Sequence, residues 1–305
     1  MTLLCDELNK IRGVECVPEV AMAPYTSFRI GGVCKAFIRP FTLPALEEVL
    51  ALLDVQDVPF RVLGRGSNLL VDDSGIGPVI CLDHLDSRPV IAGKQDDSTF
   101  IVQAGAGMRL QALIAWTLKN SLTGLEPLAG IPASLGGAIC MNAGANGISM
   151  NDVVDELLLT GPGGSSWVAA SEIDFSYRST NIPEGCLVTG ARLRLRKGSP
   201  ERSLKKIRSV MKKRCRTQPL GKANAGCVFK NPDEGPTGSL IEQCGLKGLT
   251  VGKAQVSRLH ANFIVNLGGA TSTQVMDLIT IIQEKIKTET GIELRPEIHI
   301  WKERA

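Results

Sequence analysis

The stretch from Ala129 to Gly147 constrains the fold of this chain more than any other segment. It reads AGIPASLGGAICMNAGANG and contains no charged residue. A run so rich in glycine and alanine is not typical of an exposed linker, and glycine lets the backbone approach another group closely. We therefore expect this backbone to pack against a flat or extended partner, and a flavin ring with its ribityl chain has that shape.

A second glycine-rich turn, Gly64-Arg65-Gly66-Ser67-Asn68, follows a strand-like run at 60–64. Two glycines followed by small polar residues allow consecutive backbone N–H groups to converge on an anion. The turn therefore fits a diphosphate, although an ordinary turn between two strands has the same composition.

A third glycine pair, Gly105-Ala106-Gly107, resembles the start of a dinucleotide-binding fingerprint. Leu110 stands where the third glycine of that fingerprint is required, and the expected acidic residue at the end of the next strand is absent, since Glu126 directly precedes Pro127. We therefore do not expect a Rossmann site.

The composition indicates an ordinary globular protein of 305 residues, about two domains by length. Lys and Arg outnumber Asp and Glu by only 34 to 31 and aromatic residues make up 4%, so sequence-independent nucleic-acid binding is not expected. The nine cysteines form no C-x-x-C pair, the first residues do not resemble a signal peptide, and no apolar run reaches the ~20 residues of a membrane span. We expect a cytoplasmic protein with no membrane partner.

Local patterns predict a mixture of helices and strands. The first helix is expected over 43–54, and strand-like runs occupy 60–64, 78–83 and 99–105. In a further strand at 188–196, Ala191, Leu193 and Leu195 alternate with arginines, as in a strand that is buried on one face.

The segment KGSPERS at 197–203 combines glycine, proline and charge, which favours a domain boundary. Ser199 is placed to cap the next helix, with Pro200 at its first position, and Leu204, Ile207 and Met211 are expected to form its buried face. A second periodic helix is expected from about Ser272 to Thr290, ended by Gly291. Its predicted core stripe consists of Val275, Leu278, Ile279, Ile282 and Ile286.

Seven motifs in order along the chain resemble those of the UDP-N-acetylenolpyruvoylglucosamine reductase family. They are TSFRIGG at 26–32, the 64–68 turn, the 129–147 stretch, FSYR at 175–178, AGCVFKNP at 225–232, residues 252–265 with Ala254-Gln255-Val256, and RPE at 295–297. The short route from Tyr177 to Cys227 resembles the shorter of the family's two subtypes.

The resemblance implies an α+β fold. A two-subdomain FAD-binding module of the vanillyl-alcohol oxidase type would occupy 1–84 and 85–198, and a C-terminal α/β substrate-binding domain would occupy 199–305. It also implies that NADPH reduces FAD, which then reduces UDP-N-acetyl-enolpyruvylglucosamine to UDP-N-acetylmuramate for peptidoglycan synthesis. The small-molecule substrate is the partner expected, and a monomer is favoured.

Three catalytic residues are implied by their motif positions. Arg178 matches the arginine that holds the substrate carboxylate, and Glu297 matches the glutamate that helps to stabilise the enol-like intermediate. Cys227 stands where many family members carry the serine that protonates the new stereocentre. A thiol is a stronger acid than a serine hydroxyl, but it must remain protonated in order to donate.

The resemblance also assigns binding residues. The pyrophosphate turn would use Gly64, Gly66, Ser67 and Asn68, and the flavin-facing loop would use Gly130, Ile131, Gly137, Asn142, Gly144 and Ala145. The substrate would contact Tyr177, Lys230, Asn231 and Gln255, and Arg214 or Arg216 would meet its phosphates.

Two other functions remain open at this point. An FAD-dependent sugar or alcohol oxidase could use the same cofactor module, and a nucleic-acid-binding protein could use the basic helix at 202–216. A metal site is not expected, because His84, His260 and His299 lie far apart in the sequence and form no metal-binding motif. His260 is interpreted as a hydrogen-bonded structural residue.

Overall fold

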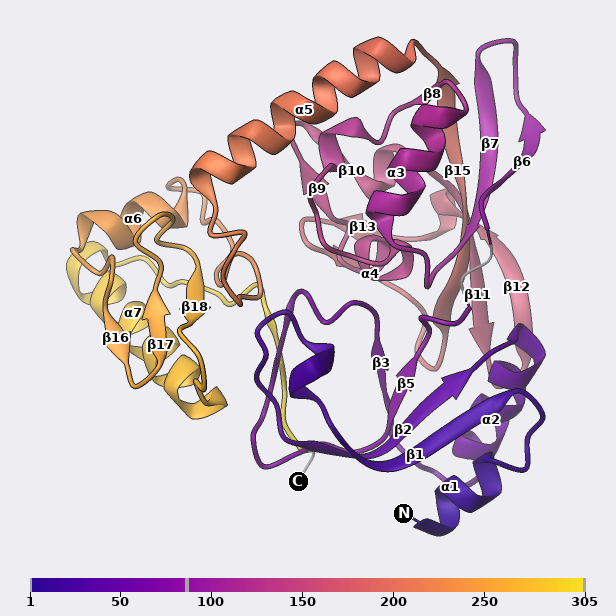
Figure 1. Ribbon diagram of the computed structural model, residues 1–305, viewed down its shortest axis with the longest axis horizontal. Coiled ribbons are helices and arrows are strands. Elements are labelled where there is room, and N and C mark those ends of the chain that lie inside the picture. The colour runs from indigo at the N-terminus through magenta and orange to yellow at the C-terminus, as the bar shows by residue number, and fades with distance from the viewer. Residues whose placement is uncertain (1, 86–87, 304–305) are drawn as a thin grey trace. The chain divides into compact units, whose positions relative to one another are not determined.

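The computed structural model describes residues 2–85 and 88–303 and has the expected mixture of helices and strands (Figure 1). The chain separates into two compact units, each assembled from three segments. Unit 1 comprises Met1–Pro18, Ala36–Arg65 and Pro78–Lys212, and unit 2 comprises Glu19–Lys35, Gly66–Gly77 and Lys213–Ala305.

Unit 1 contains a six-stranded antiparallel sheet in which β11, β15 and β7 are central. The inward residues of β15, Ala191, Leu193 and Leu195, are buried, whereas Arg194 and Arg196 are exposed, so the predicted alternation is confirmed. Helices α3 (Leu110–Lys119) and α4 (Leu135–Cys140) pack onto this sheet. The strands are β6 (Val90–Lys94), β7 (Thr99–Gly105), β8 (Leu122–Thr123), β11 (Val154–Gly161), β12 (Gly164–Ala169) and β15 (Leu187–Lys197).

A four-stranded sheet has the order β1-β2-β5-β3, in which β2, β5 and β3 are parallel. The predicted helix at 43–54 forms as α2 (Leu43–Val55), but it is the second helix of the chain, because α1 (Thr2–Leu8) precedes it. Thr42 caps α2 by accepting from the Ala45 N–H at 3.3 Å. The strands are β1 (Val14–Ala21), β2 (Val33–Pro40), β3 (Arg61–Leu63) and β5 (Val79–Cys81).

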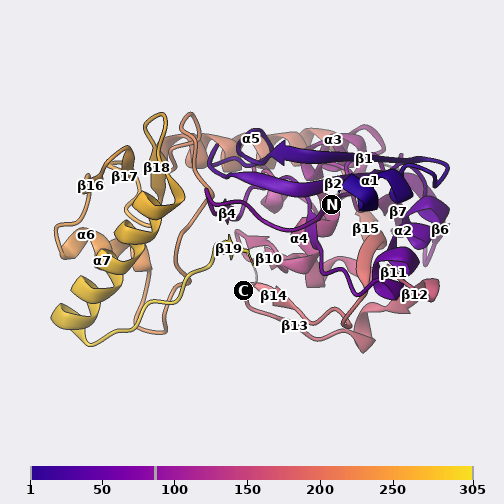
Figure 2. The same cartoon turned by 90° about the horizontal axis from the view of Figure 1, so that it is seen from below.

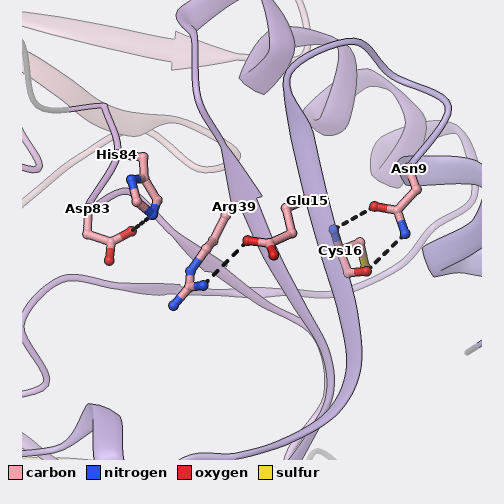
Figure 3. Close-up of polar contacts among 6 residues, drawn as sticks. All are labelled: Asn9, Glu15, Cys16, Arg39, Asp83 and His84. Atoms are coloured by element: carbon pink, nitrogen blue, oxygen red, sulfur yellow. Dashed lines mark hydrogen bonds and ion pairs between the residues drawn. The ribbon is translucent and has the colours of Figure 1, made fainter.

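Polar side chains fix the outer parts of this sheet in unit 1 (Figure 3). Arg39 Nη1 on β2 lies 3.4 Å from Glu15 Oε2 on β1, and His84 Nε2 lies 3.8 Å from Asp83 Oδ1. The Asn9 amide makes two hydrogen bonds with the backbone of Cys16, accepting from its N–H at 2.8 Å and donating to its carbonyl at 2.9 Å.

Unit 2 contains an antiparallel sheet of β16, β17 and β18 against which α7 packs (Figure 2). Every residue of the predicted stripe on α7 is buried, and Gly291 ends the helix with a φ of +75°, so both expectations are confirmed. A parallel pair, β4 with β19, joins two segments far apart in sequence. The elements are β4 (Leu69–Val71), α6 (Thr237–Gln243), β16 (Thr250–Val251), β17 (Ala254–Val256), β18 (Ile264–Asn266), α7 (Ser272–Thr290) and β19 (His299–Trp301).

Helix α5 (Pro200–Thr217) begins as the sequence predicts, because the Ser199 hydroxyl accepts from the Arg202 N–H at 3.3 Å. Its predicted buried face is only partly right: Ile207 packs against the core of unit 1, but the fully buried positions lie one residue before Leu204 and Met211. Ser203 and Val210 are the buried positions, and Leu204 and Met211 are only half-buried. The buried Ser203 hydroxyl donates a hydrogen bond to the buried carboxylate of Glu126.

The remaining elements are short. They are the 3-10 helices η1 (Ala23–Tyr25), η2 (Glu126–Leu128), η3 (Met150–Asp152) and η4 (Ala170–Glu172), and the two-residue strands β9 (Gly144–Ala145), β10 (Ile148–Ser149), β13 (Phe175–Ser176) and β14 (Ser179–Thr180).

Candidate active site

The 129–147 stretch packs against β7 and α3 within unit 1. The backbone N–H of Gly136 donates to the Ala106 carbonyl at 2.9 Å, and a Cβ added at Gly136 would lie 2.8 Å from the Ala106 Cβ. Gln111 accepts from the Gly130 N–H at 3.1 Å and donates to the Ile131 carbonyl at 3.0 Å. We expect the backbone of this segment to pack closely against a partner. For part of the segment, that partner is the protein itself.

Gly64 lies against the same stretch. A Cβ at Gly64 would lie 2.6 Å from the hydroxyl of Ser134, the residue that caps α4, and 3.9 Å from the Cα of Gly137. The structure therefore brings Gly64 and Gly137 together within unit 1. A side chain at position 64 would collide with Ser134, so only glycine keeps these two backbones so close. A backbone without side chains is also what a closely held cofactor requires.

The last three residues of the 64–68 turn, Gly66, Ser67 and Asn68, belong to unit 2. Gly66 has a φ of +57°, and a Cβ there would lie 2.1 Å from the carbonyl of Tyr25, so only glycine fits. The Ser27 N–H donates to the Gly66 carbonyl at 3.0 Å. Asn68 donates to the Glu297 carbonyl at 3.1 Å, which ties the turn to the segment that carries a predicted catalytic residue.

Arg178 and Tyr177 form the two-residue turn of the β13–β14 hairpin. Arg178 has a φ of +59°, a left-handed conformation that costs a residue other than glycine about 1 kcal/mol. Its guanidinium lies 5.1 Å from the ring centroid of Tyr177, and its Nη1 donates to the Gly144 carbonyl at 3.3 Å. The hairpin is thus attached directly to the 129–147 stretch.

Two further hydrogen bonds fix this hairpin. Asn142 donates to the Ser176 carbonyl at 3.0 Å, and Thr180 donates to the Ile139 carbonyl at 2.6 Å. The Asn142 side chain also accepts from the Asn151 N–H at 3.1 Å. Within unit 1 the structure therefore assembles Tyr177 and Arg178 with Asn142, Gly144 and their neighbour Ala145.

In unit 2 the segments of Cys227 and Glu297 lie side by side. The Glu297 N–H donates to the Val228 carbonyl at 2.7 Å, and the Lys230 N–H donates to the Arg295 carbonyl at 2.9 Å. Cys227 is half-buried, and Gly226 before it has a φ of +81°. Two of the three predicted catalytic residues are therefore carried on adjacent backbone segments.

Arg214 lies on the last turns of α5, half-buried, with its Nε unpartnered among the described residues. Burial lowers the pKa of its guanidinium, and the nearby Cys227 and Cys215 thiols oppose this shift. Arg214 is therefore an electrostatic neighbour of Cys227. Arg216 is exposed on the same helix.

The other predicted substrate residues of unit 2 are placed differently. Lys230 is half-buried beside Arg295, and Asn231 is exposed and accepts from the Thr237 N–H at 3.0 Å. Gln255 lies on β17, where its amide donates to the Thr250 hydroxyl at 2.9 Å. That contact belongs to the β16–β17 hairpin and not to the Cys227 segment.

Sequence reasoning missed two buried polar residues, Glu126 and Asn262. Glu126 is 4% exposed and accepts from Ser203, Thr123 and Gly124. Asn262 is 3% exposed and is bonded to the Phe229 backbone. Asn262 lies in the 252–265 motif, so its position in that motif is the signal that could have found it.

Among residues 2–85 and 88–303, no cluster of three or more His, Cys, Asp or Glu side chains is arranged to hold a metal ion. Within the same ranges, none of the helices combines the length and apolar character needed to cross a membrane.

Comparison with known proteins gives two family matches in the order of the chain. Residues 34–169 match the FAD binding domain, and residues 218–301 match the C-terminal domain of UDP-N-acetylenolpyruvoylglucosamine reductase. An FAD-binding module followed by this C-terminal domain, and hence the expected fold class, is confirmed. The glycine-lined backbone around Gly64 and Gly137 fits such a cofactor.

Individual relatives agree with these matches. A UDP-N-acetylenolpyruvoylglucosamine reductase of Syntrophobacter fumaroxidans is 38% identical over 98% of this chain and 88% of its own length. That of Syntrophotalea carbinolica is 41% identical over 92% of each chain. The crystal structure of the reductase from Thermus caldophilus superimposes with a TM-score of 0.81 at 35% identity, covering 95% of this chain and 99% of that one. This chain belongs to the UDP-N-acetylenolpyruvoylglucosamine reductase family.

Proposed function

We propose that this protein is an FAD-dependent enzyme that uses NADPH to reduce UDP-N-acetyl-enolpyruvylglucosamine to UDP-N-acetylmuramate, a precursor of peptidoglycan. Family membership over nearly the whole chain supports the reaction. The observation that carries the assignment of residues is the pairing of the Cys227 and Glu297 segments, through the hydrogen bond from the Glu297 N–H to the Val228 carbonyl at 2.7 Å.

The glycine-rich segments would hold the cofactor. Backbone groups of Gly64, Gly66, Ser67 and Asn68 would bind the pyrophosphate, and the flavin would lie against Gly130, Ile131, Gly137, Asn142, Gly144 and Ala145. When bound there, FAD would supply hydride-transfer chemistry between NADPH and the enolpyruvyl group. We divide the FAD-binding residues between subdomains 1–84 and 85–198, and assign the substrate-binding domain to 199–305.

Hydride addition to the methylene carbon leaves negative charge next to the substrate carboxylate. Arg178 would bind this carboxylate with two parallel N–H donors, which a planar guanidinium can provide and an ammonium cannot. Glu297 would stabilise the enol form together with Arg178. Cys227 would then donate its Sγ proton to the carbon that carries the carboxylate.

The remainder of the substrate is a uridine diphosphate sugar with two negatively charged phosphates. Tyr177, Lys230, Asn231 and Gln255 supply hydrogen-bonding groups for it, and Arg214 or Arg216 supplies positive charge for the phosphates. We further propose that the enzyme acts in the cytoplasm and as a monomer. Its nine cysteines, all among the described residues, form no disulfide bond, which is typical of a protein from a reducing compartment.

An assay of redox stoichiometry tests this function against that of an FAD-dependent sugar or alcohol oxidase. We expect NADPH to be consumed beyond the one equivalent that reduces the flavin of the enzyme only when the enolpyruvyl substrate is added, with one lactyl product formed per further NADPH. An oxidase would instead consume oxygen and form hydrogen peroxide from an unmodified sugar or alcohol, without NADPH. Peroxide formation of this kind would overturn the proposal.

A further inference from the structure

We propose that Asn262 is a positioning residue for Cys227 and Glu297. The proposal rests on the proposed function, because it assigns a role to the backbone that carries two of the catalytic side chains. Asn262 is not expected to touch the substrate. It would act by holding the 227–230 segment at the position where the Cys227 thiol can donate its proton.

The Asn262 amide binds the Phe229 backbone as a neighbouring strand would. Its Oδ1 accepts from the Phe229 N–H at 2.9 Å, and its Nδ2 donates to the Phe229 carbonyl at 2.8 Å. The backbone carbonyl of Asn262 also accepts from the Val228 N–H at 2.8 Å. One residue therefore makes three hydrogen bonds to two consecutive residues directly after Cys227.

The opposite side of the same segment is bonded to the segment of Glu297. The Val228 carbonyl accepts from the Glu297 N–H at 2.7 Å, and Phe229 forms a bridge with Pro296. The 227–230 segment is therefore held between Asn262 and the residues around Glu297. Movement away from Asn262 would change the distance between the Cys227 thiol and the Glu297 carboxylate.

The turn that presents Asn262 is itself fixed. The Ser257 N–H donates to the Phe263 carbonyl at 2.8 Å, and the Ser257 hydroxyl accepts from the His260 N–H at 3.3 Å. The Asn262 N–H donates to Nδ1 of His260 at 3.3 Å. Asn262 is 3% exposed, so water cannot readily replace its bonds to Phe229.

Replacement of Asn262 by aspartate keeps one of the two side-chain hydrogen bonds with the Phe229 backbone and removes the other. An ionised carboxylate can accept from the Phe229 N–H but has no donor for the Phe229 carbonyl, and the two oxygens would repel each other. The Asn262→Asp variant keeps nearly the same shape. It should therefore displace the segment while disturbing the surrounding core little.

The experiment compares the two half-reactions of the Asn262→Asp holoenzyme with those of the wild type. We expect reoxidation of the reduced flavin by the enolpyruvyl substrate to slow about 10²-fold, as for a displacement of about 1 Å in a catalytic group. Reduction of the flavin by NADPH should change less than about twofold, because Cys227 takes no part in it. An equal loss in both half-reactions would show a general structural defect and overturn the proposal.

Asn9→Asp is the matched control. Asn9 makes the same pair of hydrogen bonds, with the Cys16 backbone in unit 1 (Figure 3), but has no proposed role in the site. This variant should leave both half-reactions unchanged. If Asn262→Asp behaves like Asn9→Asp, the proposal is wrong.

Two further measurements do not depend on turnover, and the first of them, made on the wild type, does not depend on folding of the aspartate variant either. In wild-type holoenzyme the Phe229 amide should exchange with deuterium as slowly as core amides of β18, and rapid exchange would contradict the proposal. In Asn262→Asp, alkylation of Cys227 by iodoacetamide, followed by mass spectrometry of its peptide, should be about tenfold faster because the segment opens more often. If wild-type reduced enzyme does not react with the enolpyruvyl substrate, the proposed function fails, and these two measurements still decide the role of Asn262.

Discussion

The backbone N–H of Glu297 donates to the carbonyl of Val228 at 2.7 Å, so the segment that carries the predicted enol-stabilising carboxylate is bonded directly beside the one that carries Cys227. The two residues are far apart in sequence and share one anchored backbone. Their relative position is therefore set by main-chain hydrogen bonds, which a side-chain substitution at either residue leaves in place. Substitutions at Cys227 can thus be interpreted as changes in chemistry.

Replacement of Cys227 tests its role as the proton donor. Cys227→Ser should retain substantial turnover, because a hydroxyl can occupy the same position and donate a proton. Cys227→Ala should reduce the rate of substrate reduction by about 10²–10⁴-fold, the usual contribution of a general acid. Stopped-flow absorbance should show that NADPH still bleaches the flavin of both variants at the wild-type rate.

Substrate reduction by Cys227→Ala at nearly the wild-type rate would refute this role. A useful control is Cys244→Ala, which removes another partly exposed thiol of unit 2. Its two half-reactions should match those of the wild type.

Two substitutions of Arg178 test separately the role of its guanidinium group and the effect of its backbone conformation. Arg178→Lys keeps a positive charge but loses the planar fork, and we expect reoxidation of the reduced flavin by substrate to slow about 10²–10³-fold. Arg178→Gly should lose at least as much activity but should not lower the melting temperature, because glycine adopts the φ of +59° without strain. A marked fall in the melting temperature of the glycine variant would contradict the backbone argument.

Glu126 should contribute stability that depends on its charge. Burial raises the pKa of this carboxyl, but hydrogen bonds from Ser203, Thr123 and Gly124 outweigh burial and leave the pKa below its ordinary value. A lowered pKa in the folded state means that the stabilisation is present above the ordinary pKa of about 4.3 and is lost as the pH falls through the folded-state value. Glu126→Gln should therefore lower the free energy of unfolding at neutral pH by about 1.5–3 kcal/mol.

Urea unfolding at about pH 7 and about pH 4 measures this effect, and the difference between Glu126→Gln and wild type should shrink at the lower pH. Glu201→Gln is the control, because Glu201 accepts a hydrogen bond from Ser199 near the start of α5, the helix that carries Ser203, but is exposed. That variant should change stability by less than about 0.5 kcal/mol. A pH-independent loss in Glu126→Gln would show that the charge of Glu126 is not the cause.

His260 should make the protein less stable in mild acid. Burial, and then the positive charge of Lys247, lower its pKa, against the opposing effects of a backbone hydrogen bond and Glu242. The unfolded chain therefore binds a proton at a higher pH than the folded one, and stability is lost as the pH falls below about 6.5. His260→Asn can still accept from the Asn262 N–H and should weaken this loss.

The free energy of unfolding between about pH 7 and about pH 5 provides the measurement, with His84→Asn as the control. His84 is an exposed partner of Asp83, so its replacement should leave the pH dependence nearly as in the wild type (Figure 3). An identical pH dependence in wild type and His260→Asn would exclude His260 as its source.

Local sequence patterns were sufficient to predict the helices and strands in which hydrophobic residues recur with a clear period. The alternation in the second half of β15 and the stripe on α7 follow from the sequence, because there the buried residues recur with the period of a strand or of a helix. The buried face of α5 does not follow in the same way. A polar contact, Ser203 with Glu126, replaces Leu204 at the centre of that face, and no hydrophobic pattern signals a buried hydroxyl.

The candidate site, too, follows only in part from the sequence. The motif positions of Cys227 and Glu297 were identified from the sequence, but the pairing of their segments depends on contacts between distant parts of the chain. The pairing of β4 with β19 is similarly long-range and has no local signal. Asn262 lies within one of the family motifs, but no local pattern distinguishes an asparagine that bonds like a strand from any other polar residue in a turn.

The most direct test of the account is a single-turnover measurement on enzyme whose flavin has been reduced by NADPH in the absence of oxygen. On mixing with UDP-N-acetyl-enolpyruvylglucosamine, the absorbance of the oxidised flavin should return much faster than on mixing with air, and the product should contain two hydrogen atoms more than the substrate. A flavin that stays reduced with this substrate and is reoxidised by air would contradict the account.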